Sequence, residues 1–447
     1  MGHLAGPILR KPIEEAVEEE MSICRLVNQE RGKNVNLVDP PIPPPAIPMA
    51  APPPEPRILR THDELLEEIF LLLPTAADLA RASLARASFR RLITGHAFLR
   101  RYRTLHPPPL IGVLEVHDNA FFPAQPPHPS AAAARTFAGF DFSYSSFLPS
   151  TAGRTWSAID LFDGRLLLGG APEERTCDFD YLQLLVWELA VCDPVFRRYI
   201  LLPAVPGDLT ALAPEPEDFL DLDTFLAPGD DEQDSLSFRV MFLVRCTRNM
   251  LLLIFSSVDG QWHALTFDQC RSVPGTFDPY KDGMIRRQFV GRCFCWHPAI
   301  RNDLLLLDTH SMEFSTVSLQ PEPLQCQSDD YVVVEAAQGM LGMLLVINDG
   351  HNHDGPYRLE YSVLRNNQWH SEKVIPLPEK YDVLLFGVAG GYVLIQAQYT
   401  PSLQENPGFF SVDIKTLQVE FFGEASDGSD SGELYAGFPP SLCAPTI

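Results

Sequence analysis

The feature that most constrains the fold is a pair of hairpin signatures that recur along the C-terminal part of the chain. In the first signature an apolar run ends in Asp and a second apolar run follows, as at Asp193, Asp308 and Asp413. In the second, a polar pair suited to the positive φ angles of a tight hairpin precedes Gln-Trp, as at Trp262 and Trp369. In chain order these five marks lie 69, 46, 61 and 44 residues apart.

Repeats of about 45 to 60 residues with several strands each indicate a β-propeller or a related closed array. The longest step contains residues 207–236, which have nine or more acidic residues, several prolines and no Lys or Arg, and which we predict to be a solvated loop. An ordinary β-sandwich with irregular loops is the alternative fold. We therefore predict a mainly antiparallel, propeller-like β repeat domain over residues 151–447, preceded at residues 106–150 by a linker and the entry to the β domain.

A short helical pattern precedes this β region, over residues 57–105. Thr61-His-Asp-Glu64 has the spacing of a capping box and predicts the start of a helix. An apolar stripe with helical spacing follows, formed by Leu65, Ile69, Leu72 and Leu73, and Pro74 ends it. A second helix start at residues 75–78 and a third helix that stops at Gly95 complete the module. So small a unit does not bury every Leu that it displays, so the pattern predicts a protein partner.

Residues 1–56 are expected to form a disordered N-terminal tail. Its first part is acidic, and ten of the seventeen residues from Pro40 to Pro56 are proline. Such a density of proline favours an extended polyproline II segment. A plain spacer is the simpler interpretation of this segment, and a proline-rich ligand for another protein is the alternative.

The net charge of -24 is unevenly distributed along the chain. Residues 57–103 carry nine basic and five acidic residues, whereas the chain after them is strongly acidic. An acidic body repels phosphate backbones and anionic membrane surfaces, so we expect neither nucleic acid nor membrane as a partner. The start of the chain lacks a signal-peptide pattern, no apolar run is long enough to span a membrane, and the nine cysteines are scattered. These features favour reduced thiols and a location in the cytoplasm or nucleus.

Two short segments contain residues that commonly bind metals. Cys293-Phe-Cys295-Trp-His297 would place two thiols and an imidazole on one strand face, but a zinc site needs a fourth ligand and usually wider spacing. Buried free cysteines are the simpler interpretation. The segment His351-Asn-His353-Asp354-Gly355 is either a metal loop or an ordinary polar turn. We predict no metal or cofactor.

No motif in the sequence pairs a nucleophile with its base, so we predict no catalytic residue. A propeller-type enzyme is an alternative, and it requires carboxylates or histidines that converge in the folded protein.

The helical module resembles an F-box. The matching positions are Asp63, Glu64, Leu65, Leu66, Ile69, Leu73, Pro74, Asp78, Leu79, Leu84, Phe89, Arg90, Arg91, Leu92 and Ile93. The downstream chain is similar to cereal-grass F-box proteins with a β-propeller-like associated region, through Ala97–Leu110, Cys192-Asp-Pro194 with Leu202-Pro203, Leu307-Asp-Thr309 with Phe314, and Gly437–Ser441. Two positions depart from the pattern: Thr61-His62 replaces the opening Leu-Pro, and Arg86 replaces a small apolar residue.

The resemblance implies an α+β multidomain protein with a three-helix F-box followed by the β domain. It implies a non-catalytic substrate receptor of a Skp-cullin-F-box ubiquitin ligase. The F-box would bind the Skp adaptor, and through it a cullin, while the β domain captures a protein for ubiquitylation. The implied adaptor-binding residues are Leu65, Leu66, Ile69, Leu73, Pro74, Leu79, Leu84, Phe89 and Leu92. The alternative is a stand-alone β-repeat interaction protein whose F-box has decayed.

Overall fold

The computed structural model describes residues 57–73, 76–106, 109–115, 120–137, 142, 144–149, 154–172, 185, 187–194, 197–213, 218–229, 237–246, 249–268, 284–298, 303–319, 331–348, 357–377, 382–398, 408–424 and 432–437. The chain divides between residues 107 and 108 into two compact units. The first is helical and the second is built almost entirely of β-strands. The predicted tail, residues 1–56, lies outside the described residues.

The described part of the helical unit has four helices: α2 (Arg57–Leu71), α3 (Ala76–Ala85), α4 (Ala87–Ile93) and α5 (His96–Leu105). The first three fall in the region where we expected helices, and α5 is additional. The expected start at Thr61 is wrong, because α2 already begins at Arg57. Arg and Leu are good helix formers, and they carry the helix back past the capping sequence.

The core of the helical unit is small and mostly aromatic and aliphatic. Its buried residues are Phe70, Leu71, Leu79, Ile93, Phe98 and Tyr102. The Tyr102 hydroxyl donates to the Leu73 carbonyl at 3.1 Å, and a ring nitrogen of His106 lies 2.8 Å from the Leu71 carbonyl oxygen. Both contacts hold the end of α5 against the end of α2.

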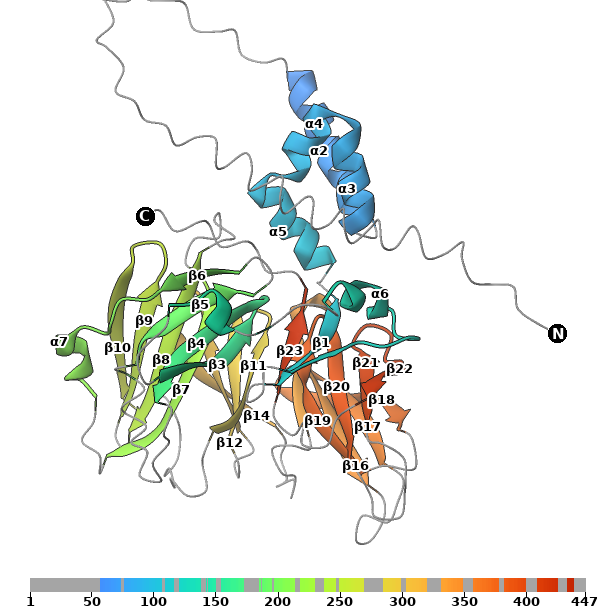
Figure 1. The fold of residues 1–447 in the computed structure, drawn as a ribbon. Helices are drawn as coiled ribbons and strands as arrows, with labels where there is room; N and C mark the ends of the chain where they lie inside the picture. The colour runs from blue at the N-terminus through green and yellow to red at the C-terminus, as the bar shows by residue number, and fades with distance from the viewer. Residues whose placement is uncertain are drawn as a thin grey trace, which may run out of the picture. The chain divides into compact units, whose positions relative to one another are not determined.

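The β unit is a six-bladed antiparallel propeller, which confirms the predicted propeller-like repeat domain (Figure 1). Blade 1 has β3 (Arg154–Phe162), β4 (Arg165–Pro172), β5 (Leu189–Asp193) and β6 (Arg198–Leu201). Blade 2 has β7 (Phe219–Pro228), β8 (Phe238–Cys246), β9 (Asn249–Ser256) and β10 (Gln261–Asp268). Blade 3 has β11 (Met284–Val290), β12 (Cys293–Pro298), β13 (Asp303–Asp308) and β14 (Glu313–Ser318).

Blade 4 has β15 (Tyr331–Glu335), β16 (Leu341–Asn348), β17 (Tyr357–Arg365) and β18 (Gln368–Pro376). Blade 5 has β19 (Asp382–Ala389), β20 (Tyr392–Gln398), β21 (Gly408–Asp413) and β22 (Val419–Glu424). Blade 6 combines β23 (Gly432–Ala436) with β1 (Leu110–Glu115) and β2 (Phe121–Pro123). Two short helices, α6 (Ala131–Ala134) and α7 (Gly207–Thr210), lie in the connections.

The first strand of each blade forms an inner ring. Contacts join β3 to β7, β11 to β15, β15 to β19, β19 to β23 and β23 to β3. Blade 6 closes this ring with strands from both ends of the unit, because β1 pairs antiparallel with β23 and sets Val113 opposite Leu434. The ring is therefore closed by backbone hydrogen bonds between segments that are far apart in sequence.

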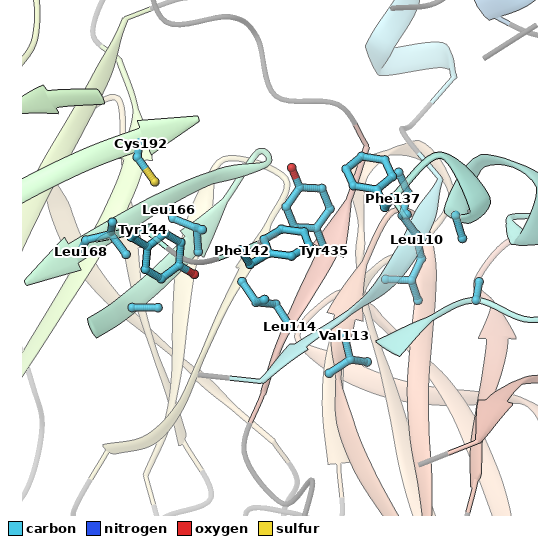
Figure 2. Packing of buried hydrophobic residues seen from close by; sticks show 14 of the residues in the cluster. Leu110, Val113, Leu114, Phe137, Phe142, Tyr144, Leu166, Leu168, Cys192 and Tyr435 are labelled. Carbon is cyan, nitrogen blue, oxygen red and sulfur yellow. The ribbon is translucent and has the colours of Figure 1, made fainter. Parts of the chain in front are cut away.

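Five apolar cores fill the interfaces between neighbouring blades. One cluster joins blades 1 and 2, others join blades 2 and 3, 3 and 4, and 4 and 5, and the last packs blade 6 against blades 1 and 5. Figure 2 shows part of this last cluster, where Phe142 and Tyr435 lie side by side between strands of blades 1 and 6. The middle strands are buried on both faces, as in β8 and β9. Their sequences are therefore nearly continuous apolar runs, without an alternation of apolar and polar residues.

Each of the five predicted marks falls in a different blade. Asp193, Asp308 and Asp413 end the third strands of blades 1, 3 and 5. Trp262 and Trp369 lie near the start of the fourth strands of blades 2 and 4. The alternation between third and fourth strands explains the unequal spacing of the marks.

Two parts of the predicted domain plan differ from the structure. Residues 219–228, inside the segment that we expected to be a loop, form β7, the inner strand of blade 2. Its acidic side chains, Asp221 and Asp223, pair with Arg245 and Arg287. These ion pairs replace part of the hydration of the two carboxylates, so the segment can lie within the sheet. The expected linker at residues 106–150 contains β1 and β2, which are strands of blade 6. No helix among the described residues is long and apolar enough to cross a membrane.

Candidate functional site

The helical unit exposes a row of large apolar side chains on α2. Leu65, Ile69 and Leu72 leave 58%, 55% and 80% of their surface accessible, and Leu84 on α3 leaves 62%. Leu65 and Ile69 are spaced by four positions and share one face of α2, and Leu72 follows directly after the helix, where its backbone N–H donates to the Ile69 carbonyl. The row is a candidate protein-binding surface, and we call it the apolar face.

The implied adaptor-binding residues divide into three groups. Leu65 and Ile69 belong to the apolar face, and Leu84 is exposed on α3. The others pack inside the unit: Leu79 is buried, and partly buried side chains lie against the same core, namely Leu66, Leu73, Phe89 and Leu92. Pro74 lies outside the described residues. Substituting the second group would disturb the fold of the unit, so only the first group tests binding directly.

Arg86 does not place a charge inside the helical core. It forms the extended N-cap of α4 between two helices, and its side chain is exposed. Its guanidinium lies 5.8 Å from the centre of the Phe89 ring. The long side chain thus covers an aromatic edge while its charge stays in water.

Ion pairs partly neutralise the basic residues of the helical unit. Arg101 on α5 pairs with Glu68 at 2.5 Å and lies 3.8 Å from Glu67, both on α2. The hydrogen bond that Arg101 donates to Glu68 raises the pKa of Arg101 above its ordinary value. Arg91 lies 3.6 Å from Asp63. The excess of basic residues over acidic ones in residues 57–103 is therefore partly offset by ion pairs between helices.

The two cysteines of the segment Cys293–His297 lie on β12 as free thiols, of which Cys295 is buried and Cys293 partly buried. Cys295 is fully buried, and its Sγ lies 3.9 Å from the Cys293 carbonyl oxygen. Burial raises the pKa of Cys295 to about 12, so the thiol stays protonated near neutral pH. The His297 side chain and the segment from His351 to Gly355 lie outside what is described. Within the described residues no group of three His, Cys, Asp or Glu side chains is arranged to hold a metal ion.

A charged cluster lies on the inner ring of the propeller. Arg287 on β11 pairs with Asp223 on β7 and with Asp160 on β3, in both cases at 2.5 Å. Its guanidinium also lies 4.5 Å from the centre of the Phe225 ring. Burial would lower the pKa of Arg287, but the nearby carboxylates outweigh burial and hold that pKa above its ordinary value. One buried cation thus connects three consecutive blades.

Both aspartates of this cluster have a donor at each carboxylate oxygen. Asp160 accepts from Arg287 at Oδ1 and from the Leu226 backbone N–H at Oδ2, the latter at 2.7 Å. Asp223 accepts from Arg287 at Oδ1 and from the Trp296 indole N–H at Oδ2, also at 2.7 Å. These contacts leave neither carboxylate oriented toward a substrate, and they favour a structural role for the pair.

The sequence analysis missed this cluster. Arg287 is 64 residues from Asp223 and 127 from Asp160, so no local motif contains two of its members. The available signal was the blade period itself, because the three residues occupy inner strands of consecutive blades. A second signal was the alternation Leu220-Asp221-Leu222-Asp223, which indicates a strand with one apolar face.

Comparisons with known proteins identify no family for this chain. No family model matches it, and no curated protein matches it. Among solved structures it is similar to the NanB sialidase from Streptococcus pneumoniae, with 12% identity and a TM-score of 0.28 over 53% of this chain and 35% of the sialidase. The chain thus spans about a third of the sialidase.

It is also similar to a functionally unknown protein from Desulfotomaculum acetoxidans, with 9% identity and a TM-score of 0.31 over 63% of this chain and 76% of that one. The alpha-L-arabinanase of Penicillium chrysogenum gives 9% identity and a TM-score of 0.31 over 61% of this chain and 85% of the arabinanase. Similarity at this level carries no argument about what this chain does.

Proposed function

We propose that this protein is a non-catalytic substrate receptor of a Skp-cullin-F-box ubiquitin ligase. Its helical unit would bind the Skp adaptor through the apolar face, and its propeller would capture a protein target. The observation that carries the proposal is the exposure of Leu65, Ile69 and Leu72 on a unit that resembles an F-box in sequence. Apolar anchors of this kind typically dominate the energy of a protein interface.

The propeller supports the second half of the proposal. The apolar cores of the propeller lie between its blades. A partner can therefore bind the rims and outer strands without disturbing the packing that stabilises the propeller. The outermost strand of blade 4, β18, has mostly exposed side chains. We place the ligase in the cytoplasm or nucleus, without a nucleic-acid or membrane partner.

The charged cluster of the inner ring supports an enzyme less than a non-catalytic receptor. A propeller enzyme would need free carboxylates that converge on a substrate. The oxygens of Asp160 and Asp223 already accept from Arg287, Leu226 and Trp296. A glycosidase or other hydrolase built on this pair would first have to break these contacts.

The test is co-purification of the full chain with a Skp adaptor, comparing wild type with the Leu65→Ala/Ile69→Ala double variant. Both side chains are largely exposed, so the double variant keeps the fold. We expect loss of binding by about 2 kcal/mol or more, roughly a thirtyfold weaker complex. Glu64→Ala, an exposed change on the same helix, is the matched control. A folded wild-type chain that does not bind the adaptor would overturn the ligase proposal and leave the stand-alone interaction protein.

A further inference from the structure

The most exposed large apolar side chain among the described residues is that of Leu72, at the point where α2 ends. It leaves 80% of its surface accessible, against 55% for Ile69, its neighbour on the apolar face. The Leu72 backbone N–H donates to the Ile69 carbonyl oxygen at 3.2 Å, a bond of the tightened kind that often closes the last turn of a helix. Leu72 therefore continues the apolar face past the last residue of α2.

Side chains of α5 hold the backbone on both sides of Leu72. The last carbonyl groups of a helix lack partners within the helix. Here the Tyr102 hydroxyl donates to the Leu73 carbonyl oxygen at 3.1 Å. His106 Nε2 lies 2.8 Å from the Leu71 carbonyl oxygen, and because a carbonyl only accepts, Nε2 carries the proton that it donates. We call Tyr102 and His106 the clamp.

Packing within α5 fixes the two donors of the clamp. Tyr102 is 6% exposed, and its ring stacks on that of Phe98, a core residue of the helical unit, with 6.2 Å between ring centres. The His106 ring lies 4.3 Å from the Tyr102 ring, and the His106 backbone N–H donates to the Tyr102 carbonyl oxygen at 2.8 Å. A stack of rings thus directs both donors at the end of α2.

A further contact joins α5 to the middle of α2. Arg101 pairs with Glu68 at 2.5 Å and lies 3.8 Å from Glu67. The pair is largely exposed, so it contributes little free energy, but it shows that α5 lies along α2 and does not touch only its end.

We propose that Leu72 contacts the adaptor and that Tyr102 and His106 are the positioning residues that present it, which makes α5 a fourth helix of the adaptor-binding unit. The inference rests on the proposed function. Tyr102 is buried, so it acts on binding through the backbone beside Leu72. An anchor that is already held in place binds with a smaller loss of conformational entropy than a mobile one.

The first experiment measures binding of the full chain to a purified Skp adaptor. Leu72→Ala removes an exposed side chain, so it keeps the fold, and we expect about thirtyfold weaker binding. Leu212→Ala is the matched control, because Leu212 is a 51% exposed leucine of the propeller unit. This control should bind as wild type.

The second experiment removes the clamp. Tyr102→Phe keeps the stacked ring without its hydroxyl, and His106→Leu removes the imidazole. We expect the double variant to bind the adaptor about tenfold more weakly. His106→Gln, whose amide can donate to the same carbonyl, should recover most of the loss caused by His106→Leu.

Combining the two sets of changes shows whether the clamp acts through Leu72. Where it does, removing the clamp from Leu72→Ala causes no further loss of binding. A clamp that only stabilises the helical unit would instead give losses that multiply, as independent sites do.

Hydrogen exchange tests the clamp without the adaptor. The backbone N–H groups of Leu72 and Leu73 donate to the carbonyls of Ile69 and Phe70. Their protection should fall about tenfold in the Tyr102→Phe/His106→Leu variant, while that of the propeller strand β8 stays unchanged.

The outcomes separate this inference from the proposal on which it rests. A folded wild-type chain that does not bind the adaptor would overturn both. Adaptor binding that survives Leu72→Ala, independent losses for the clamp and Leu72, or unchanged exchange in the clamp variant would overturn the inference alone. Self-association of the chain that Leu72→Ala abolishes would assign this surface to a second copy and also overturn it. If the double variant does not fold, Tyr102→Phe alone, which loses one hydroxyl, gives the same comparison.

Discussion

At the scale of single residues, the most unusual side chain is Arg287. Its guanidinium lies between two aspartates and near two aromatic rings, 4.5 Å from the centre of Phe225 and 5.9 Å from that of Phe294. Removing a charge from water costs free energy, and the two ion pairs offset that cost only while they are intact. The residue therefore stabilises the ring through its partners.

Replacing Arg287 tests this dependence. Arg287→Gln leaves Asp160 and Asp223 without their cation, so we expect the free energy of unfolding to fall by about 3 to 5 kcal/mol. Arg292→Gln is the control, because Arg292 is 70% exposed and pairs with Asp308 at the surface. The control should cost at most about 1 kcal/mol. Urea unfolding followed by circular dichroism measures both, and equal losses would contradict the role given to Arg287.

At the scale of structural elements, the fourth strands of blades 2 and 4 each carry a tryptophan whose indole N–H donates to the preceding blade or the residues just after it. The Trp262 indole donates to the Pro203 carbonyl, just beyond the last strand of blade 1, at 2.8 Å. The Trp369 indole donates to the Ser318 carbonyl at the end of β14, the last strand of blade 3, at 3.0 Å. In both cases the outer strand of one blade is hydrogen-bonded to that of the preceding blade.

Substituting these tryptophans separates the hydrogen bond from the packing. Trp262→Phe and Trp369→Phe keep an aromatic ring but remove the donor. We expect a loss of about 1 to 3 kcal/mol for Trp262, which is buried, and about 1 kcal/mol or less for Trp369, which is partly exposed. Thermal unfolding of the two variants gives the comparison. A larger loss at Trp369 would show that the bond to blade 3 matters more than burial.

Hydrogen bonds within the turns explain why the repeat was visible in the sequence. Asp308 Oδ1 accepts from the backbone N–H groups of His310 and Ser311, and Asp413 Oδ1 accepts in the same way from Lys415 and Thr416. Local turn chemistry of this kind depends only on neighbouring residues, so it repeats as a motif. The Asn366-Asn367 turn also has the positive φ angles that its sequence predicts, 51° and 58°.

Long-range pairing explains what the sequence did not reveal. β7 was hidden because its acidic residues suggested solvent, whereas their partners, Arg245 and Arg287, lie on other strands. The charged cluster of the inner ring was not predicted for the same reason, because its members lie on three different strands. The start of α2 was misplaced because a capping sequence indicates where a helix can begin, while Arg57 and its neighbours extend the helix further. Which apolar residues of the helical unit stay exposed also depends on tertiary packing.

At the scale of the whole molecule, each unit has its own core. The buried residues of the helical unit pack against one another, and those of the propeller form five clusters at blade interfaces. Independent cores are the usual basis for independent folding.

A chain of residues 108–447 should therefore fold without the helices. We expect a circular dichroism spectrum dominated by β-structure and a cooperative thermal transition within a few degrees of that of the full chain. Under the proposed function this shorter chain would keep its target and lose the Skp adaptor. An unfolded or aggregated product would show that the propeller needs residues from the N-terminal part.

The closure of blade 6 also affects how the chain folds during its synthesis. β1 leaves the ribosome long before its partner β23, which consists of residues 432–436. Until β23 is present, one edge of β1 lacks a partner, because only its other edge pairs with β2, and unpaired strand edges invite aggregation. Nascent chains of this protein should therefore depend on chaperones until β23 has been synthesised, and a premature stop codon before residue 432 should yield an open ring that proteolysis removes.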